Sequence, residues 1–178
     1  MKTKKNRLII ELVLFTALII FDQITKYLAV KYLMGNSGIS IIDKVLELYY
    51  LPNGNSGAAF GMLQGHQVLF MIIAIIVVVM IGYIIVNIPI SKKSNFLSLL
   101  LVFIAAGGIG NMIDRFMQNY VVDFIYFSLI NFPIFNVADI YVSVATVLLV
   151  IYVIFVLKED EFKEIEAAVL APIKRRRK

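Results

Sequence analysis

Two aspartates, Asp123 and Asp139, stand in an otherwise almost wholly apolar stretch, VVDFIYFSLINFPIFNVAD. A carboxylate is costly in such surroundings unless it is paired or keeps a proton. Two carboxyl groups in one low-dielectric site cannot comfortably both ionise, so one of them keeps a proton and its pKa rises. Such a pair can deprotonate a water molecule while it protonates the carbonyl group that the water attacks. The two aspartates are therefore candidates for acid–base catalysis.

Asp139 also has a purely structural interpretation. Asn136 stands three residues before it, which is the spacing of a capping box at the start of a helix. In that role Asp139 only satisfies backbone N–H groups, and the pattern leaves both interpretations open. Asp123 has no comparable alternative, because it occupies no cap or turn position and has no adjacent cation. Its partner must come from the fold.

Further polar residues share helix faces at the same expected depth as the aspartates. Asn111, Asp114 and Arg115 are spaced at i, i+3 and i+4, which places them within one arc of a helix. Asp114 beside Arg115 also fits a simple charge pair at a helix end. Asp22 and Lys26 form an i, i+4 pair, for which an ion pair that orients the first helix is favoured over direct chemistry.

The composition is that of a membrane protein. The 178 residues are 61% hydrophobic and 16% charged, whereas a soluble domain is roughly 45–50% apolar and 25% charged. The sequence contains no Cys, which excludes a thiol nucleophile, a disulfide and a thiolate metal site. The net charge of +5 acts through its distribution, which sets membrane topology and does not indicate nucleic-acid binding.

The elements that must position these residues are four transmembrane helices. An apolar run of roughly 20 residues is enough to cross a bilayer, and the predicted spans are about 8–34, 67–87, 96–116 and 137–157. The outer connection at about 36–66 is rich in β-branched, aromatic and turn-forming residues, so we expect a small β-cradle or hairpin there. A short outer loop or helix is expected before the last span. The predicted architecture is one all-α membrane domain, 1–157, followed by a charged tail, 158–178.

Basic residues predict the orientation of the bundle. They gather before the first span, between the second and third spans, and at the end of the chain, and such residues favour the cytoplasmic side. Both termini are therefore expected in the cytoplasm, with the aspartates near the outer face. The residues concerned are Lys2, Lys4, Lys5, Arg7, Lys92, Lys93 and the terminal KRRRK.

Three other functions fit part of the pattern. A proton-coupled transporter also uses intramembrane carboxylates, but it usually places them near the midplane within repeated, discontinuous helices. A lipid-transforming enzyme could bind Mg²⁺ through Asp114, Asp123 and Asp139, although Arg115 makes a bare cation site less attractive. A purely structural membrane protein has little reason to keep Asp123.

Four sequence blocks resemble the lipoprotein signal peptidases (signal peptidase II), the membrane aspartyl peptidases of bacterial lipoprotein maturation. Their order, their spacing and the four-span layout match from about residue 8 to 157. A single block is weak support, but four in order are highly specific. The blocks are DQITK (22–26), NSGAAFG (55–61), GGIGNMIDR with VVDF (107–115 and 121–124) and FNVAD (135–139).

The resemblance implies an activity and a site. It assigns catalysis to Asp123 and Asp139, with no metal or other cofactor. The implied substrate is a prolipoprotein with a diacylglyceryl-modified Cys, which is cut just before that Cys in the bacterial inner or plasma membrane. Expected partners are this signal peptide and membrane lipids, with no nucleic acid, and the chain is expected to be a monomer. The resemblance also marks Asn55, Asn111, Arg115 and Asn136 as site-lining, Asp114 as supporting them, and Asp22 with Lys26 as a polar pair needed for activity or stability.

One position departs from the family pattern. Members commonly have Arg immediately before the Asn of the second block, where this sequence has Gly54. If that Arg helps to hold lipid or a lid, another cation must replace it here, and Lys44 is a candidate. The basic tail is not a family hallmark either. Neither departure touches the aspartate pair.

Overall fold

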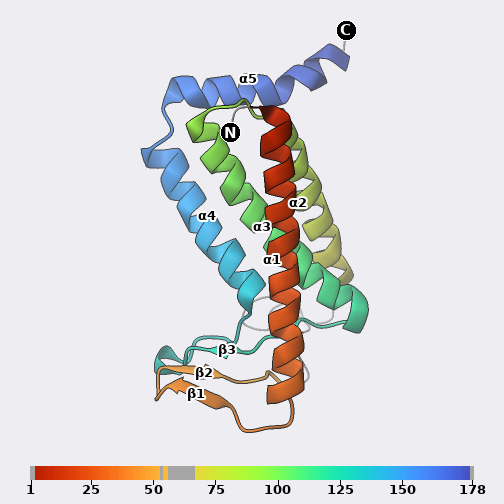
Figure 1. Ribbon diagram of the computed structural model, residues 1–178, viewed down its shortest axis with the longest axis vertical. Coiled ribbons are helices and arrows are strands. Elements are labelled where there is room, and N and C mark those ends of the chain that lie inside the picture. The colour runs from red at the N-terminus through yellow and green to blue at the C-terminus, as the bar shows by residue number, and fades with distance from the viewer. Residues whose placement is uncertain (1–2, 53, 56–66, 177–178) are drawn as a thin grey trace.

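A computed structural model describes residues 3–52, 54–55 and 67–176. Four long helices form an elongated bundle, a fifth lies across one end, and a small sheet lies at the opposite end (Figure 1). The helices are α1 (Lys4–Leu33), α2 (Gln67–Asn87), α3 (Lys92–Gln118), α4 (Val137–Phe155) and α5 (Glu159–Arg176). The remaining elements are β1 (Ile39–Ile42), β2 (Leu46–Leu48), β3 (Ile125–Tyr126) and the 3₁₀ turn η2 (Ser128–Ile130).

Polar caps determine where several of these helices begin and end. The side chain of Thr3 accepts a hydrogen bond from the Asn6 amide at the start of α1, and Ser91 does the same for α3. These caps satisfy backbone N–H groups that have no partner within the helix. α3 ends at Asn119, whose φ of 65° is left-handed, a conformation that Asn tolerates better than most residues.

Among the described residues, three helices are long and apolar enough to cross a membrane: α1, α3 and α4. A shorter apolar stretch, Met71–Asn87, lies within α2. α2 has the bounds predicted for the second span, whereas α1 and α3 start four residues before the predicted spans and α4 ends two residues earlier. Exposed Ile, Leu and Val side chains cover the outside of the bundle, as expected of a surface that faces lipid.

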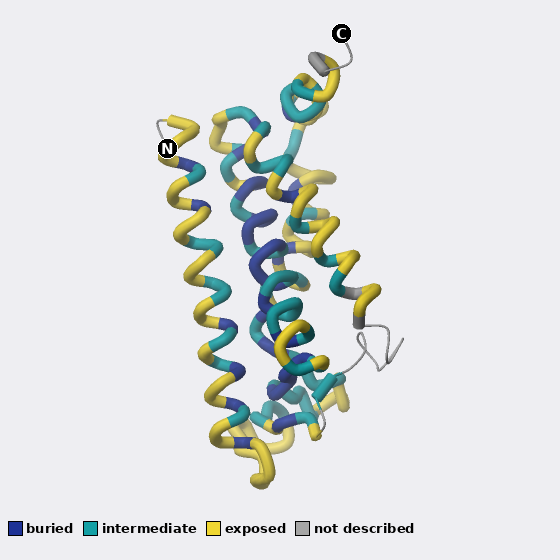
Figure 2. Tube along the Cα trace, turned by 90° about the vertical axis from the view of Figure 1, so that its right-hand side faces the viewer, coloured by how far each residue is buried: buried dark blue, intermediate teal, exposed yellow. Residues whose placement is uncertain are grey.

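α3 is the central helix. Half of its most apolar 18-residue window is buried, against 11% in α1 and 17% in α4, and Figure 2 shows a largely buried helix between more exposed ones. Small residues in α3 permit this close packing. The main apolar core lies along α3 and consists of Ile81, Ile88, Leu97, Leu100, Leu101, Ala105, Ala145, Tyr152 and Ile165.

The predicted small β-structure is confirmed and is extended by a strand that was not predicted. The sheet is antiparallel in the order β1–β2–β3, so the connection between α3 and α4 contributes β3. A second apolar cluster joins this sheet to the end of α1, through Ala29, Leu33, Tyr50, Val122 and Phe124. Residues 56–66, the rest of the predicted outer region, lie outside the described residues.

The charged tail forms a helix, α5. α5 has 18 residues and lies across the bundle end that also carries the start of α1 (Figure 1). Ile165 is buried in the main core, and the Tyr83 hydroxyl of α2 donates to the Val169 carbonyl at 2.8 Å. Lys93 of α3 pairs with Glu161 at 2.7 Å. The tail therefore packs on the helices.

Candidate active site

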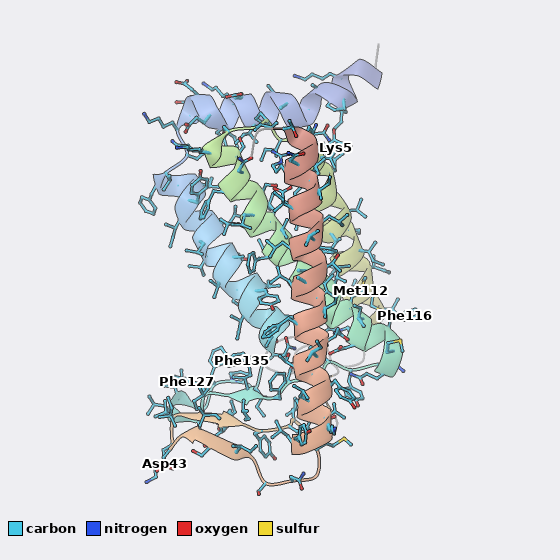
Figure 3. All side chains as sticks on the ribbon, viewed as in Figure 1. Lys5, Asp43, Met112, Phe116, Phe127 and Phe135 are labelled. Atoms are coloured by element: carbon cyan, nitrogen blue, oxygen red, sulfur yellow. The ribbon has the colours of Figure 1, made fainter. Side chains whose placement is uncertain are left out.

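The two aspartates come from different elements at the sheet-facing end of the bundle. Asp123 lies between α3 and β3 and is 1% exposed, and its carbonyl accepts a hydrogen bond from the Leu51 amide at 3.0 Å. Asp139 lies in the first turn of α4. Phe135, which just precedes α4, marks this end of the bundle in Figure 3. Because β3 pairs with both β2 and Phe135, the outer connection turns Asp123 back towards the start of α4.

A chain of asparagine amides links the two carboxyl groups. Asn136 Nδ2 donates to Asp123 Oδ1 at 2.7 Å and to Asn111 Oδ1 at 3.0 Å. Asn111 Nδ2 in turn donates to Asp139 Oδ1 at 2.8 Å. On the other side, Asn55 Nδ2 donates to Asp123 Oδ2 at 2.8 Å. Three neutral amides thus hold the aspartates and add no charge to the site.

Asp139 forms the predicted capping box and also faces the polar cluster. The Asn136 side chain accepts from the Asp139 amide at 3.0 Å, and the Asn136 amide donates to Asp139 Oδ2 at 3.1 Å. This is the predicted capping box. The other carboxylate oxygen, Oδ1, faces Asn111. Capping therefore fixes the carboxyl group in place and leaves one oxygen directed into the polar cluster.

The pKa of the Asp123 carboxyl group is raised to about 7, mainly by burial and then by the nearby charge of Asp139. Hydrogen bonds from Asn55 and Asn136 act in the opposite direction, as does the positive charge of Lys26. The raising influences prevail, so Asp123 holds a proton at a pH where an exposed Asp is ionised. A pair with one proton can supply both an acid and a base.

Lys26 is a buried cation that connects α1 with the cluster. Its ammonium lies 2.9 Å from Asp22 Oδ2 and 3.0 Å from Asp114 Oδ2, and it donates to Asn111 Oδ1 at 2.9 Å. The bond to Asn111 directs the amide nitrogen of that residue towards Asp139. Lys26 therefore contacts the cluster directly and does more than orient α1 through Asp22.

Arg115 adds a second cation next to the aspartates. Its guanidinium donates to the Asn111 carbonyl at 3.5 Å, and it interacts electrostatically with Asp139, Asp123 and Asp114. Asp114 pairs with Lys26 and accepts from the Val122 amide at 3.1 Å. In the residues that the structure describes, no group of three or more His, Asp or Glu side chains is arranged to hold a metal ion.

Comparison with known proteins identifies the family. The family described as signal peptidase (SPase) II matches residues 14–155 of this chain. The chain belongs to the signal peptidase II family. Membership makes it a peptidase, and its apolar helices make it a multi-pass membrane protein.

Several relatives cover most of the chain, and each is named lipoprotein signal peptidase. The protein from Brevibacillus brevis is 46% identical over 134 residues, which is 75% of this chain and 87% of the relative. The one from Enterococcus faecalis is 40% identical over 160 residues, or 89% and 96% of the two chains. The one from Clostridium tetani is 37% identical over 158 residues, or 86% and 96%.

Solved structures share the fold. One, described as a bacterial membrane enzyme determined by the in meso method at 1.9 Å resolution, has a TM-score of 0.70 and 29% identity. The alignment covers 82% of this chain and 93% of that chain. A second bacterial membrane enzyme, at 2.3 Å resolution, has a TM-score of 0.68 and 30% identity over 80% and 85% of the two chains.

The structure brings all of the predicted site residues of this family member into one polar cluster. The contacts described above connect them without a gap, from Asn55 at one side to Asp22 at the other. Their catalytic and binding roles stay predictions, because geometry alone does not test them. The set is Asp22, Lys26, Asn55, Asn111, Asp114, Arg115, Asp123, Asn136 and Asp139.

The sequence analysis missed Gln23. Its Nε2 lies 3.1 Å from Asp22 Oδ2 and 3.0 Å from Asp114 Oδ1, and 3.2 Å from the Gly110 carbonyl. The available signal was its spacing, because Gln23 and Lys26 are three residues apart and share a helix face.

Gly54 has a structural reason to be glycine in this chain. Its φ of 64° is left-handed, and a Cβ added there would collide with the Tyr120 ring. Arg at this position therefore requires that Tyr120 move. Lys44, the candidate replacement cation, lies exposed in the β1–β2 turn. It has no ion pair or hydrogen bond to the site among the described residues.

Proposed function

We propose that this peptidase is an aspartic endopeptidase that removes signal peptides from diacylglyceryl-modified prolipoproteins, cutting just before the lipidated Cys. The observation that carries the proposal is the pairing of Asp123 with Asp139 through Asn111 and Asn136. The names of the relatives support the substrate class.

The mechanism follows from one proton shared by two carboxyl groups. The ionised aspartate accepts a proton from water, and the resulting oxygen attacks the scissile carbonyl carbon. The protonated aspartate donates its proton to the carbonyl oxygen, which gives a tetrahedral diol. The first aspartate then passes the proton that it took from water to the amide nitrogen, while the other aspartate takes a proton back from the diol. The C–N bond breaks and gives a carboxylic acid and an amine. The aspartates act through water, so no covalent intermediate with the enzyme forms and the step needs no metal.

The surrounding residues support this chemistry in different ways. Asn111 and Asn136 keep the two carboxyl groups at a fixed separation, and Arg115 stabilises the negative charge that the cluster carries. Asn55 hydrogen-bonds to Asp123 from the segment after β2, where it can also meet substrate backbone. The exposed apolar helix faces suit the signal helix and the acyl chains of the substrate.

We place the domain, 1–157, across a bacterial inner or plasma membrane with four spans and both termini in the cytoplasm. The start of α3, which carries Lys92 and Lys93, lies at the same end of the bundle as the start of α1 and the basic end of α5 (Figure 1). Positive residues favour the cytoplasmic side, so the tail, 158–178, lies there too. The aspartates then lie near the extracytoplasmic face, where water reaches a bond close to the lipid head groups.

Cleavage of a lipidated substrate by the purified protein in detergent tests the proposal. Asp123→Asn and Asp139→Asn preserve side-chain size but remove proton exchange, so each should lower the cleavage rate by about 10²–10⁴-fold. Asp43→Asn is the matched control, because Asp43 is exposed in the β1–β2 turn, far from the helices (Figure 3). It should cleave at the wild-type rate.

Two results would contradict the proposal. If Asp123→Asn or Asp139→Asn cleaved at nearly the wild-type rate, the aspartate pair could not be the catalytic pair. If the precursor without its diacylglyceryl group were cleaved as fast as the lipidated one, the proposed substrate class would be wrong.

A further inference from the structure

Two additional carboxylates hold the segments that carry the proposed catalytic pair. The amide of Val122, the residue before Asp123, donates to Asp114 Oδ2 at 3.1 Å. The amide of Ala138, the residue before Asp139, donates to Asp22 Oδ1 at 2.9 Å. The relative position of Asp22 and Asp114 therefore affects the separation of the catalytic pair.

Lys26 links these two carboxylates but has no further donor to offer. An ammonium group has three N–H bonds, and Lys26 directs them at Asp22, Asp114 and Asn111. Asp114 Oδ1 receives none of them. Gln23 Nε2 donates to that oxygen at 3.0 Å and to Asp22 Oδ2 at 3.1 Å.

A neutral donor suits this position better than a charged one. Asp22 and Asp114 are 0% and 4% exposed, and buried carboxylates need their lone pairs satisfied. A second cation would add the cost of another buried charge. The two N–H bonds of the Gln23 amide serve three acceptors, the two carboxylates and, at 3.2 Å, the Gly110 carbonyl of α3, so one of these N–H bonds is shared between two acceptors. These bonds tie α1 to α3 at the level of the site.

We propose that Gln23 is a positioning residue for the peptidase reaction. It fixes Asp22 and Asp114 relative to each other, and these two fix Ala138 and Val122 and so the separation of the catalytic aspartates. The inference rests on the proposed function, because it requires that Asp123 and Asp139 do the chemistry. Gln23 itself contacts neither of them in the hydrogen bonds described here.

The first test is steady-state cleavage of a diacylglyceryl-modified prolipoprotein by Gln23→Leu. A misplacement of reacting groups by about 1 Å costs roughly 100-fold in rate, so kcat should fall about 10- to 100-fold while KM stays unchanged. Gln118→Leu is the matched control, because Gln118 is also half-buried and, among the residues that the structure describes, its amide donates only to the Tyr120 carbonyl, at 3.4 Å. Its kcat should equal that of the wild type.

Gln23→Glu supplies a second readout through pH. The charged groups nearest to position 23 are Asp22 and Lys26 of α1 and Asp114 of α3. Arg115 interacts with Asp114, and Asp139 of α4 lies beyond Asn111. A protonated carboxyl group has one O–H donor, so the introduced group can hydrogen-bond to only one of the two carboxylates, and only while it keeps its proton. As pH rises it ionises and repels Asp22 and Asp114, so the ratio of its kcat to the wild-type kcat should fall with rising pH.

The rates are divided by the folded fraction, measured by thermal unfolding in the same detergent, so that a folding defect is not mistaken for a positioning defect. Unchanged corrected kcat in Gln23→Leu overturns the inference, as does a pH-independent ratio for Gln23→Glu. Asp123→Asn is run in parallel. If it is inactive while Gln23→Leu is fully active, this inference fails and the proposed function stands. If Asp123→Asn cleaves normally, the proposed function fails and this inference fails with it.

Discussion

Opposing influences act on the pKa of Asp123, and in the proposed mechanism their balance sets the pH range of activity. Burial and Asp139 raise its pKa to about 7 despite the hydrogen bonds from Asn55 and Asn136. Below that pH the Asp123 carboxyl group keeps its proton, and above it Asp123 loses that proton and can no longer act as the acid. We therefore expect kcat/KM for a lipidated precursor to fall about tenfold per unit as pH rises above 7. A flat profile between pH 7 and 9 would contradict this assignment.

The hydrogen bond from Asn55 offers a test of the same balance. That bond stabilises ionised Asp123 and lowers its pKa, so Asn55→Ala should move the alkaline decline in activity to higher pH. The profile is measured with the same lipidated precursor. Asn36→Ala is the control, because Asn36 is exposed and its side chain donates to the Tyr32 carbonyl. A shift to lower pH in Asn55→Ala, or an equal shift in both variants, would show that the bond does not act on Asp123.

Elements differ in how well the sequence predicts them, for physical reasons. A helix that faces lipid needs a continuous apolar run, and such runs indicated α1 to α4. β3 has only two residues and exists because β2 pairs with it, so its formation depends on a contact that no local pattern contains. The spacing of the sequence motifs indicated the residues that form the polar cluster. Gln23 was missed because its role depends on the distance between α1 and α3, which helical spacing on one element does not give.

Adding a single methyl group at Gly107 tests the close packing between α3 and α4. A Cβ at Gly107 would lie 2.5 Å from the Ala138 carbonyl oxygen and 2.7 Å from Val142 Cγ2. Since backbone cannot easily yield, Gly107→Ala should destabilise the protein by about 1–3 kcal/mol and reduce cleavage by moving the first turn of α4. Gly108→Ala is the neighbouring control, because its nearest contact is Val78 Cγ2 at 3.7 Å. Thermal unfolding and cleavage rates in detergent measure both variants, and equal behaviour would exclude this contact as a constraint.

The whole molecule is an apolar bundle with polar contacts concentrated at its two ends. The site cluster joins α1, α3 and α4 at one end. At the other, Lys93 joins α3 to α5, and the Tyr152 hydroxyl of α4 donates to the Lys93 carbonyl at 3.0 Å. In lipid, helices gain little from apolar contact with one another. Polar contacts at both ends therefore fix the register of the helices, and the site depends on that register.

At the end of the bundle remote from the site, Arg7 makes several of the polar contacts that fix the register of the helices. It is 0% exposed, and it donates to three carbonyl oxygens near the end of α2, those of Ile85, Ile88 and Pro89, at 2.7–3.2 Å. The sequence analysis treated it only as a topological charge. Its guanidinium also lies 3.7 Å from buried Glu11, which would lose its cation if Arg7 were removed.

Arg7→Ala should therefore lower the free energy of unfolding by about 3–5 kcal/mol, measured by thermal or denaturant unfolding in detergent. Lys5→Ala removes an exposed cation from the same helix turn and should change stability little. Arg7 lies about 22 Å along α1 from Asp22, at 1.5 Å per residue, so protein that remains folded at low temperature should cleave at the wild-type rate. A stable Arg7→Ala variant would contradict the anchoring role of Arg7. A folded but inactive one would mean that the remote end controls the geometry of the aspartates as well as the stability of the bundle.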